Sequence, residues 1–320
     1  MAPGMSPGTA SALAATAVVA SAAGAAASRL PRAAVCLAGE LRVDGVGTLE
    51  SVAERVLRPL AADAFVYAPL KAGTPTPEEL LKAYSLPGLV SLHVTVEDAT
   101  ALLWHDVRRY HPSDRAAQNL WRVLRKVSGS WLGGLKERPS REALRAANTS
   151  KVPRRRHGSG LLVMLSWKRC LDMVQSAESQ AGRPYDWVIA TRADMFWEHD
   201  HIPLDMLSRD AVWIPEQLDW GGQYDRHAVI PWGHSPPKNC PACLSYAHYY
   251  LDAWRFLVDG TAALALSEMP PAGPAFKLGC PEGPCINSEN WLDVRLRMGH
   301  VNVSALPHLA WVACQRKGIH

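Results

Sequence analysis

The stretch Tyr185-Asp-Trp-Val-Ile-Ala-Thr-Arg-Ala-Asp194 decides the fold class. Val188 to Ala190 form an apolar run that is too short for a buried helix. Aromatic residues precede it, as is typical of a strand covered on both faces. Arg192 and Asp194 follow at the carboxyl end, where an α/β sheet usually places its ligand. Two interpretations of this pair stay open: Asp194 binds a metal ion, or the two side chains form a salt bridge that fixes the strand end.

A helix is predicted before this strand. Apolar residues recur there at helical spacing, and Gly182-Arg-Pro184 then ends the helix. The recurring residues are Val163, Trp167, Cys170, Leu171, Val174 and Ala177.

The same alternation occurs near the start of the chain. Residues 33–38 read as a buried strand that opens into Gly39-Glu-Leu-Arg42, a helical stripe covers 49–60, and a second strand covers 64–67. A helix beginning at Pro77 and a strand near 91–96 continue the pattern. The sequence therefore predicts a single α/β domain with a Rossmann-like, mostly parallel central sheet flanked by helices.

Length and charge define the broad class. The chain has 320 residues, is 48% apolar and carries a net charge of +4, which is too small to indicate nucleic acid as a partner. Basic residues are concentrated between 100 and 158. We interpret 100–158 as a partly flexible basic insertion within a domain that covers 33–320.

Residues 1–32 form a low-complexity, Ala-rich segment, and the first 28 of them carry no charge. We expect this segment to stay outside the folded core. A secretory signal, an organellar transit peptide and a disordered tail remain open, and a transmembrane anchor is disfavoured by the abundance of alanine. The triplets Asn148-Thr-Ser150 and Asn302-Val-Ser304 fit the glycosylation pattern. Together these features favour the secretory pathway or Golgi lumen, with organellar and cytoplasmic locations and membrane association open.

The cysteines fall into two groups. Cys36 and Cys170 lie in predicted core elements and are interpreted as small buried hydrophobes. Cys240-Pro-Ala-Cys243 and Cys280-Pro-Glu-Gly-Pro-Cys285 lie in Pro-rich loops. These four residues could hold a structural zinc ion or form disulfides, and disulfides are favoured if the protein is secreted.

A glycine pair marks a third candidate segment, which follows a short strand at 212–215. Gly221 and Gly222 allow a ligand or another backbone to approach closely. Asp225 and His227 come next and are expected on one side of an extended segment, with Arg226 pointing away. Asp225 could act as a general base or cap a turn, and His227 alone is more often a packed or surface residue.

A predicted helix begins near Ser288. Its N-cap places Glu289 in the first turn, where the helix dipole favours an acidic side chain. Glu289 is either a structural residue or a residue facing the site.

Five segments together resemble a group of GT-A-fold glycosyltransferases found in algae, plants and large viruses. The resemblance spans about residues 33–314 without 100–158. The segments are Ala34-Val-Cys-Leu-Ala-Gly-Glu-Leu-Arg42, Asp63-Ala-Phe-Val-Tyr67, Tyr185 to Asp194, Gly221-Gly-Gln-Tyr-Asp-Arg-His-Ala228 and Asn287-Ser-Glu289.

The resemblance implies a nucleotide-sugar donor over the carboxyl edge of the first strands and an Asp-x-Asp motif that holds Mn²⁺ or Mg²⁺ against the diphosphate. Asp194 matches the second acid of that motif. Arg192 replaces the first, which implies weaker metal dependence, with Arg192 itself facing the phosphates. The expected donor-binding residues are Gly39, Arg42, Arg192, Gly221 and Gly222.

Transfer of a sugar to a glycan, protein or small-molecule hydroxyl needs a general base. Asp225 is the expected base and Glu289 the second candidate. No P-loop and no Gly-x-Gly-x-x-Gly follows a strand, which disfavours kinases, nucleotidases and dinucleotide enzymes. The alternative is a non-catalytic glycan-binding or zinc-stabilised scaffold protein of the same fold.

Overall fold

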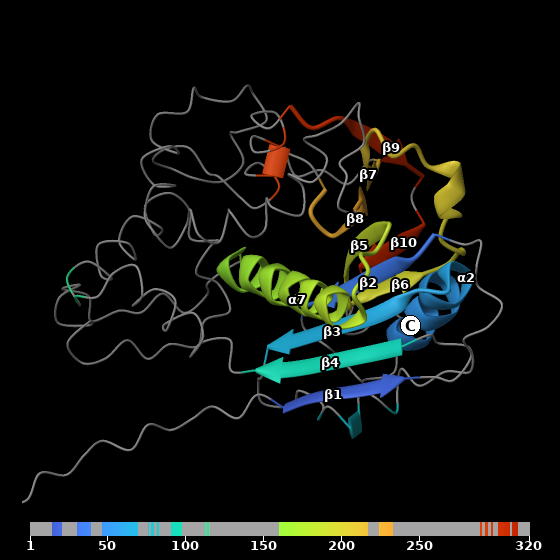
Figure 1. Cartoon of the computed structure of the whole chain (residues 1–320). Helices are drawn as coiled ribbons and strands as arrows, with labels where there is room; N and C mark the ends of the chain where they lie inside the picture. The colour runs from blue at the N-terminus through green and yellow to red at the C-terminus, as the bar shows by residue number, and fades with distance from the viewer. Residues whose placement is uncertain are drawn as a thin grey trace, which may run out of the picture.

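The computed structural model describes residues 15–20, 31–39, 47–69, 91–97, 160–216, 224–232, 300–307 and 309–312, and isolated positions 76, 78, 79, 82, 113, 115, 289, 292, 293 and 296. An eight-stranded sheet in the order β1-β4-β3-β2-β5-β8-β7-β9 forms the centre of the described part of the chain (Figure 1). The strands are β1 Ala15–Ala20, β2 Ala33–Ala38, β3 Asp63–Pro69, β4 Ser91–Glu97, β5 Trp187–Arg192, β7 Val212–Pro215, β8 His227–Pro231 and β9 Val303–Leu306.

Two smaller groups of elements accompany this sheet. A two-stranded sheet pairs β6 (Met195–Trp197) with β10 (Ala310–Val312). Helical segments run through α1 (Thr48–Val52), η1 (Ala53–Leu57) and α2 (Arg58–Leu60), and a short turn of helix, η3, covers Leu204–Met206. The long helix α7 covers Gly160–Ala181.

The sheet is mixed: four pairs of neighbouring strands, β7 with β9 among them, are parallel, and β1 and β8 run antiparallel to their neighbours. Strands β4, β3, β2 and β5 pair in parallel, as expected from alternating strands and helices. Beyond β5 the pattern changes, because β8 pairs antiparallel with both β5 and β7. The connection from β7 to β8 covers residues 216–226, which is less than the crossover that parallel neighbours usually need, and the sequence pattern did not reveal this reversal.

Strand β1 was not expected from the sequence. It pairs antiparallel with β4 along six residues, from Ala15 opposite Val96 to Ala20 opposite Ser91. Part of the low-complexity N-terminal segment therefore forms an edge of the sheet. The basic insertion at 100–158 lies outside the described residues apart from 113 and 115.

Apolar side chains bury the centre of the sheet on both faces. Every residue of β2 is buried, and Val188 and Ile189 of β5 are fully inaccessible. Helix α7 lies across β2 and β3 (Figure 1) and contributes the buried Trp167 and Val174 to this core. The described part of the chain includes no helix with the length and apolarity needed to cross a membrane.

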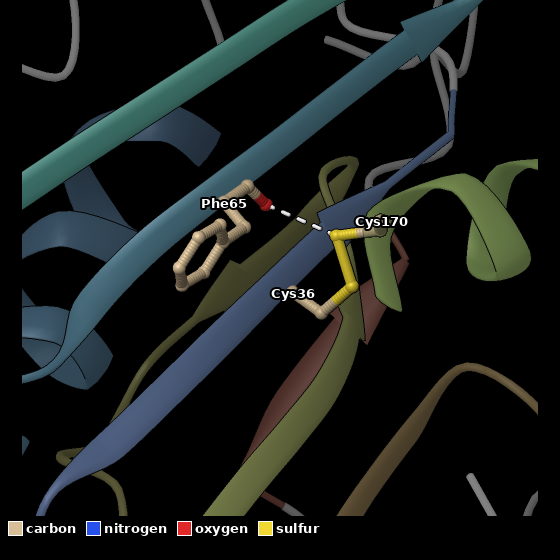
Figure 2. The surroundings of a disulfide bond; sticks show 3 residues. All are labelled: Cys36, Phe65 and Cys170. Carbon is tan, nitrogen blue, oxygen red and sulfur yellow. Dashed lines mark hydrogen bonds between the residues drawn. A yellow bond between two sulfur atoms is a disulfide. The ribbon is translucent and has the colours of Figure 1, made fainter. Parts of the chain in front are cut away.

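A disulfide joins Cys36 of β2 to Cys170 of α7 (Figure 2). Both residues are fully buried, as expected, but they are bonded to each other and are not independent small hydrophobes. Sγ of Cys170 also lies 3.3 Å from the carbonyl oxygen of Phe65, and since a disulfide sulfur carries no hydrogen, this is a packing contact. The bond fixes the helix to the central strand across a separation of 134 residues.

Removing this bond is expected to destabilise the fold. In Cys36→Ala/Cys170→Ala the free energy of unfolding should fall by about 2–5 kcal/mol, because the unfolded chain loses a long covalent loop. Urea unfolding of the oxidised protein and of the double variant measures the difference. Peptide mapping without reductant should recover the 36 and 170 peptides joined, and alkylation of both cysteines in the unreduced, denatured protein would contradict the bond.

Candidate functional site

The carboxyl ends of β2 and β5 form the point where the strand order reverses. From β2 the chain moves to β3 and β4 on one side, and it then returns through α7 to β5 on the other side of β2. Loops that leave such neighbours diverge, and ligands of open α/β sheets bind in the crevice between them. Ala38 pairs with Arg192, and the amide of Ala193 donates a hydrogen bond of 3.3 Å to the carbonyl of Ala38. The structure thus brings Gly39 next to Arg192 and Asp194.

Gly39 turns the chain directly after β2. Its φ is +124°, a conformation that L-residues rarely adopt, although a Cβ placed there would meet no atom within 4 Å. Backbone conformation, rather than lack of space, requires glycine at this position.

Arg192 and Asp194 form a two-pronged ion pair. Nε of Arg192 donates to Oδ1 of Asp194 at 2.8 Å, and Nη2 donates to Oδ2 at 2.6 Å. The side chain of Arg192 is 31% exposed and that of Asp194 is 13% exposed. Burial lowers the pKa of Arg192, but the hydrogen bonds and charge of Asp194 outweigh it, so the pKa is raised and the guanidinium stays charged.

A second ion pair lies beside the first. The amide of Arg192 donates to the carbonyl of Arg226 at 3.0 Å, so the two arginines are neighbours across adjoining strands. Nη2 of Arg226 lies 3.8 Å from Oε1 of Glu289. Asp225 precedes Arg226 in the chain, is buried, and its charge helps to raise the pKa of Arg192. Two guanidinium groups and three carboxylates therefore meet at this edge and leave one net negative charge.

A divalent cation at Asp194 would share this carboxylate with Arg192. Both of its oxygens already accept hydrogen bonds from Arg192. Two like unit charges about 4 Å apart near a protein surface repel by about 4 kcal/mol, and a divalent ion beside the guanidinium would feel about twice that. Among the described residues no group of three His, Cys, Asp or Glu side chains is placed to hold a metal ion.

The described residues include five of the candidate site residues. Gly39, Arg192, Asp194, Asp225 and Glu289 lie at the same edge of the sheet or next to it. The remaining candidates lie outside the described residues: Arg42, Gly221, Gly222, Cys240, Cys243, Cys280 and Cys285.

Arg226 belongs to the site, although the sequence did not indicate it. Its side chain was expected to point away from Asp225 and His227 and was not linked to the site, but it contacts Glu289. Spacing alone gave no signal for this contact, because Glu289 lies in a distant segment of the chain.

His227 belongs to a buried cluster of three rings below this edge. The ring centroids of Trp197, His201 and His227 lie 5.0 to 5.8 Å apart. Nδ1 of His201 lies 2.7 Å from the carbonyl of Ile202, so Nδ1 carries the proton and donates it. Within the described part of the chain, Nε2 of His201, both ring nitrogens of His227 and Nε1 of Trp197 have no hydrogen-bond partner.

Burial keeps both histidines neutral. It lowers the pKa of His201 to about 4, despite the hydrogen bond with Ile202 that raises it. Burial lowers the pKa of His227 well below 6.5, and the neighbouring His201 lowers it further. Among the described residues no carboxylate contributes to either shift, so the hydrogen bond of His201 with Ile202 is the one effect that favours the charged form, and burial outweighs it.

The region around the site is similar to a described protein family. A family described as Domain of unknown function (DUF7796) matches residues 140–235, which include α7 and strands β5 to β8. No curated protein matches the chain. The matched region contains Arg192, Asp194 and Asp225, whereas Gly39 and Glu289 lie outside it.

The histidine cluster predicts a loss of stability in acid. Both folded-state pKa values lie below the unfolded value of about 6.5, so the unfolded chain binds more protons below that pH. The contribution of neutral His201 to the free energy of unfolding is fully present above about pH 6.5. As the pH falls from there to about 4, this contribution should decrease by about 1.4 kcal/mol per pH unit. Urea unfolding of the wild type and of His201→Gln at about pH 7 and about pH 5 measures this. An equal pH dependence in both proteins would contradict it.

Gly39→Ala should lower the free energy of unfolding more than Gly182→Ala, although both glycines have open space around them. A Cβ built on Gly182 would also meet no atom within 4 Å, but the φ of Gly182, +65°, lies in the left-handed region that L-residues visit. We expect Gly182→Ala to cost about 1 kcal/mol and Gly39→Ala about 2–3 kcal/mol of unfolding free energy. Thermal unfolding of the two variants provides the comparison, and equal losses would show that Gly39 is not conformationally required.

Proposed function

We propose that this protein is a glycosyltransferase that moves a sugar from a nucleotide-sugar donor to a hydroxyl acceptor. The observation that carries the proposal is the position of Arg192 at the carboxyl edge of β2 and β5, where the strand order reverses. Such an edge binds nucleotides in open α/β sheets, and a fixed guanidinium recognises phosphate oxygens.

A GT-A-like arrangement of the domain is part of this proposal. The order β4-β3-β2-β5 follows the 3-2-1-4 order of doubly wound nucleotide-binding sheets, with the switch point between β2 and β5. The antiparallel β8 after β5 then brings Asp225 and Arg226 to the same edge. The donor-binding half and the candidate base thus come from neighbouring strands.

In the proposed reaction the acceptor oxygen attacks the anomeric carbon of the donor, and the bond from that carbon to the diphosphate breaks. The acceptor proton passes to the carboxylate of Asp225, and negative charge builds up on the leaving diphosphate. Positive groups that face this charge stabilise it more in the transition state than in the ground state. Glu289 is the second candidate base, although its contact with Arg226 at 3.8 Å favours a positioning role.

The expected partners are a nucleotide-sugar and a glycan, protein or small-molecule acceptor. A secretory or Golgi location belongs to the same proposal. The buried disulfide between β2 and α7 supports it, because disulfides persist in oxidising compartments.

A donor screen tests this function. The oxidised protein is mixed in turn with UDP-sugars and GDP-sugars, and the shift of its unfolding temperature is measured with Mn²⁺ and with a chelator. One donor class should stabilise the protein under at least one condition, by mass action. Stabilisation by a free oligosaccharide, with none by any nucleotide-sugar, would favour the glycan-binding scaffold.

Asp225→Asn should separate binding from transfer. The substitution keeps the shape of the side chain and removes the basic oxygen, so donor affinity should persist while the transfer rate falls at least about a hundredfold. Asp205→Asn, at an exposed position on η3, is the matched control and should keep the wild-type rate. Unchanged transfer by Asp225→Asn, measured with the donor found in the screen, would remove Asp225 from the chemistry.

A further inference from the structure

We propose that the guanidinium of Arg192, held by Asp194, binds the donor diphosphate directly and takes the place of a bound divalent cation. The inference deepens the proposed function and rests on it for the identity of the donor. It makes Arg192 the group that contacts the leaving phosphates and Asp194 a positioning residue.

The hydrogen bonds of the pair leave one edge of Arg192 available. A guanidinium has five N–H donors, and Asp194 takes one from Nε and one from Nη2. The two donors of Nη1 and the second donor of Nη2 remain, and they lie on the edge of the guanidinium between Nη1 and Nη2 and next to it. That geometry suits two phosphate oxygens at once, which a lysine ammonium could not match.

Relative exposure decides which charge an incoming group meets. Arg192 is 31% exposed against 13% for Asp194, and Arg226 is 23% exposed against 5% for Glu289. Asp225 is also buried, at 8% exposure. The cluster has one net negative charge, but its guanidinium groups are more exposed than its carboxylates. Exposure of the individual groups is a better guide to ligand contact than the net charge of the cluster, because a ligand interacts first with the groups that reach solvent.

The same arrangement argues against a cation at Asp194. A metal ion bound to Asp194 would share its two oxygens with Arg192 and would lie beside the guanidinium, which would repel it. To bind a phosphate, the pair need not open at all. In this motif Arg192 stands where the first acid would be. In the proposed site, a guanidinium therefore neutralises the diphosphate in place of a metal ion.

Calorimetric titration of the full-length, oxidised protein tests the inference. The probes are inorganic pyrophosphate, UDP and GDP, each titrated with a chelator present and again with Mn²⁺. We expect at least one nucleoside diphosphate and pyrophosphate to bind with the chelator present, and Mn²⁺ to change the dissociation constant by less than about threefold. Arg192→Gln should weaken this binding at least about tenfold, as for the loss of hydrogen bonds to a charged group.

Three further variants control for folding and for charge. Arg192→Lys retains the charge and should recover only part of the affinity, because the fork geometry is lost. Asp194→Asn retains the side-chain shape and should weaken binding several-fold by loosening Arg192. Arg209→Gln is the matched control: Arg209 pairs with Asp186 at 3.8 Å at the opposite end of β5, and its loss should leave binding unchanged. Thermal unfolding of each variant confirms that it is folded.

The outcomes separate this inference from the proposed function. Donor binding that requires Mn²⁺ and survives Arg192→Gln would overturn the inference and leave the glycosyltransferase proposal standing. Metal-free pyrophosphate binding that depends on Arg192, without affinity for any nucleotide-sugar, would keep the phosphate site and overturn the sugar donor. Absence of binding by all probes under both conditions would overturn both.

Discussion

The parallel pairing of β2 with β5 is the interaction on which the rest of the structure depends. It joins Ala33–Ala38 to Trp187–Arg192, two segments separated by about half of the domain, and it is buried on both faces. The backbone hydrogen bonds of such a pair are protected from water, and the apolar side chains around them supply most of the driving force. Its register also sets the site, because it aligns the last residue of β2 with Arg192. A shift by one residue would turn Arg192 to the opposite face of the sheet.

Much of this architecture could be read from hydrophobic periodicity. The runs at 33–38, 64–67, 91–96 and 212–215 and the stripe at 163–177 correspond to β2, β3, β4, β7 and α7. Local patterns identify such elements because the spacing of apolar residues along the chain depends on whether one face or both faces are buried. The order of strands beyond β5 was not accessible in this way. Antiparallel insertion of β8 depends on how a connection folds back, and a short apolar run does not encode its direction.

The side-chain contacts that the sequence missed all join distant segments. Cys36 and Cys170 each fit an apolar pattern, and only the docking of α7 on β2 brings their sulfurs together. Trp197, His201 and His227 come from β6, the following loop and β8, so no spacing could reveal their cluster. For Arg192 and Asp194 the sequence offered a salt bridge and a metal site as alternatives. The two hydrogen bonds show that the pair is formed, and the phosphate-binding role proposed for it uses the pair intact.

Strand β1 has a consequence for maturation of the chain. Ala15–Ala20 cannot serve both as part of a cleaved leader and as the outer neighbour of β4, since proteolytic removal would take away the six residues that pair with Ser91–Val96. A processed protein would display the amides and carbonyls of β4 on an open edge, which is a template for pairing with another chain. An unprocessed protein would keep that edge covered by a small, uncharged strand. The pairing of these six residues with β4 therefore decides whether that edge of the sheet is covered or open.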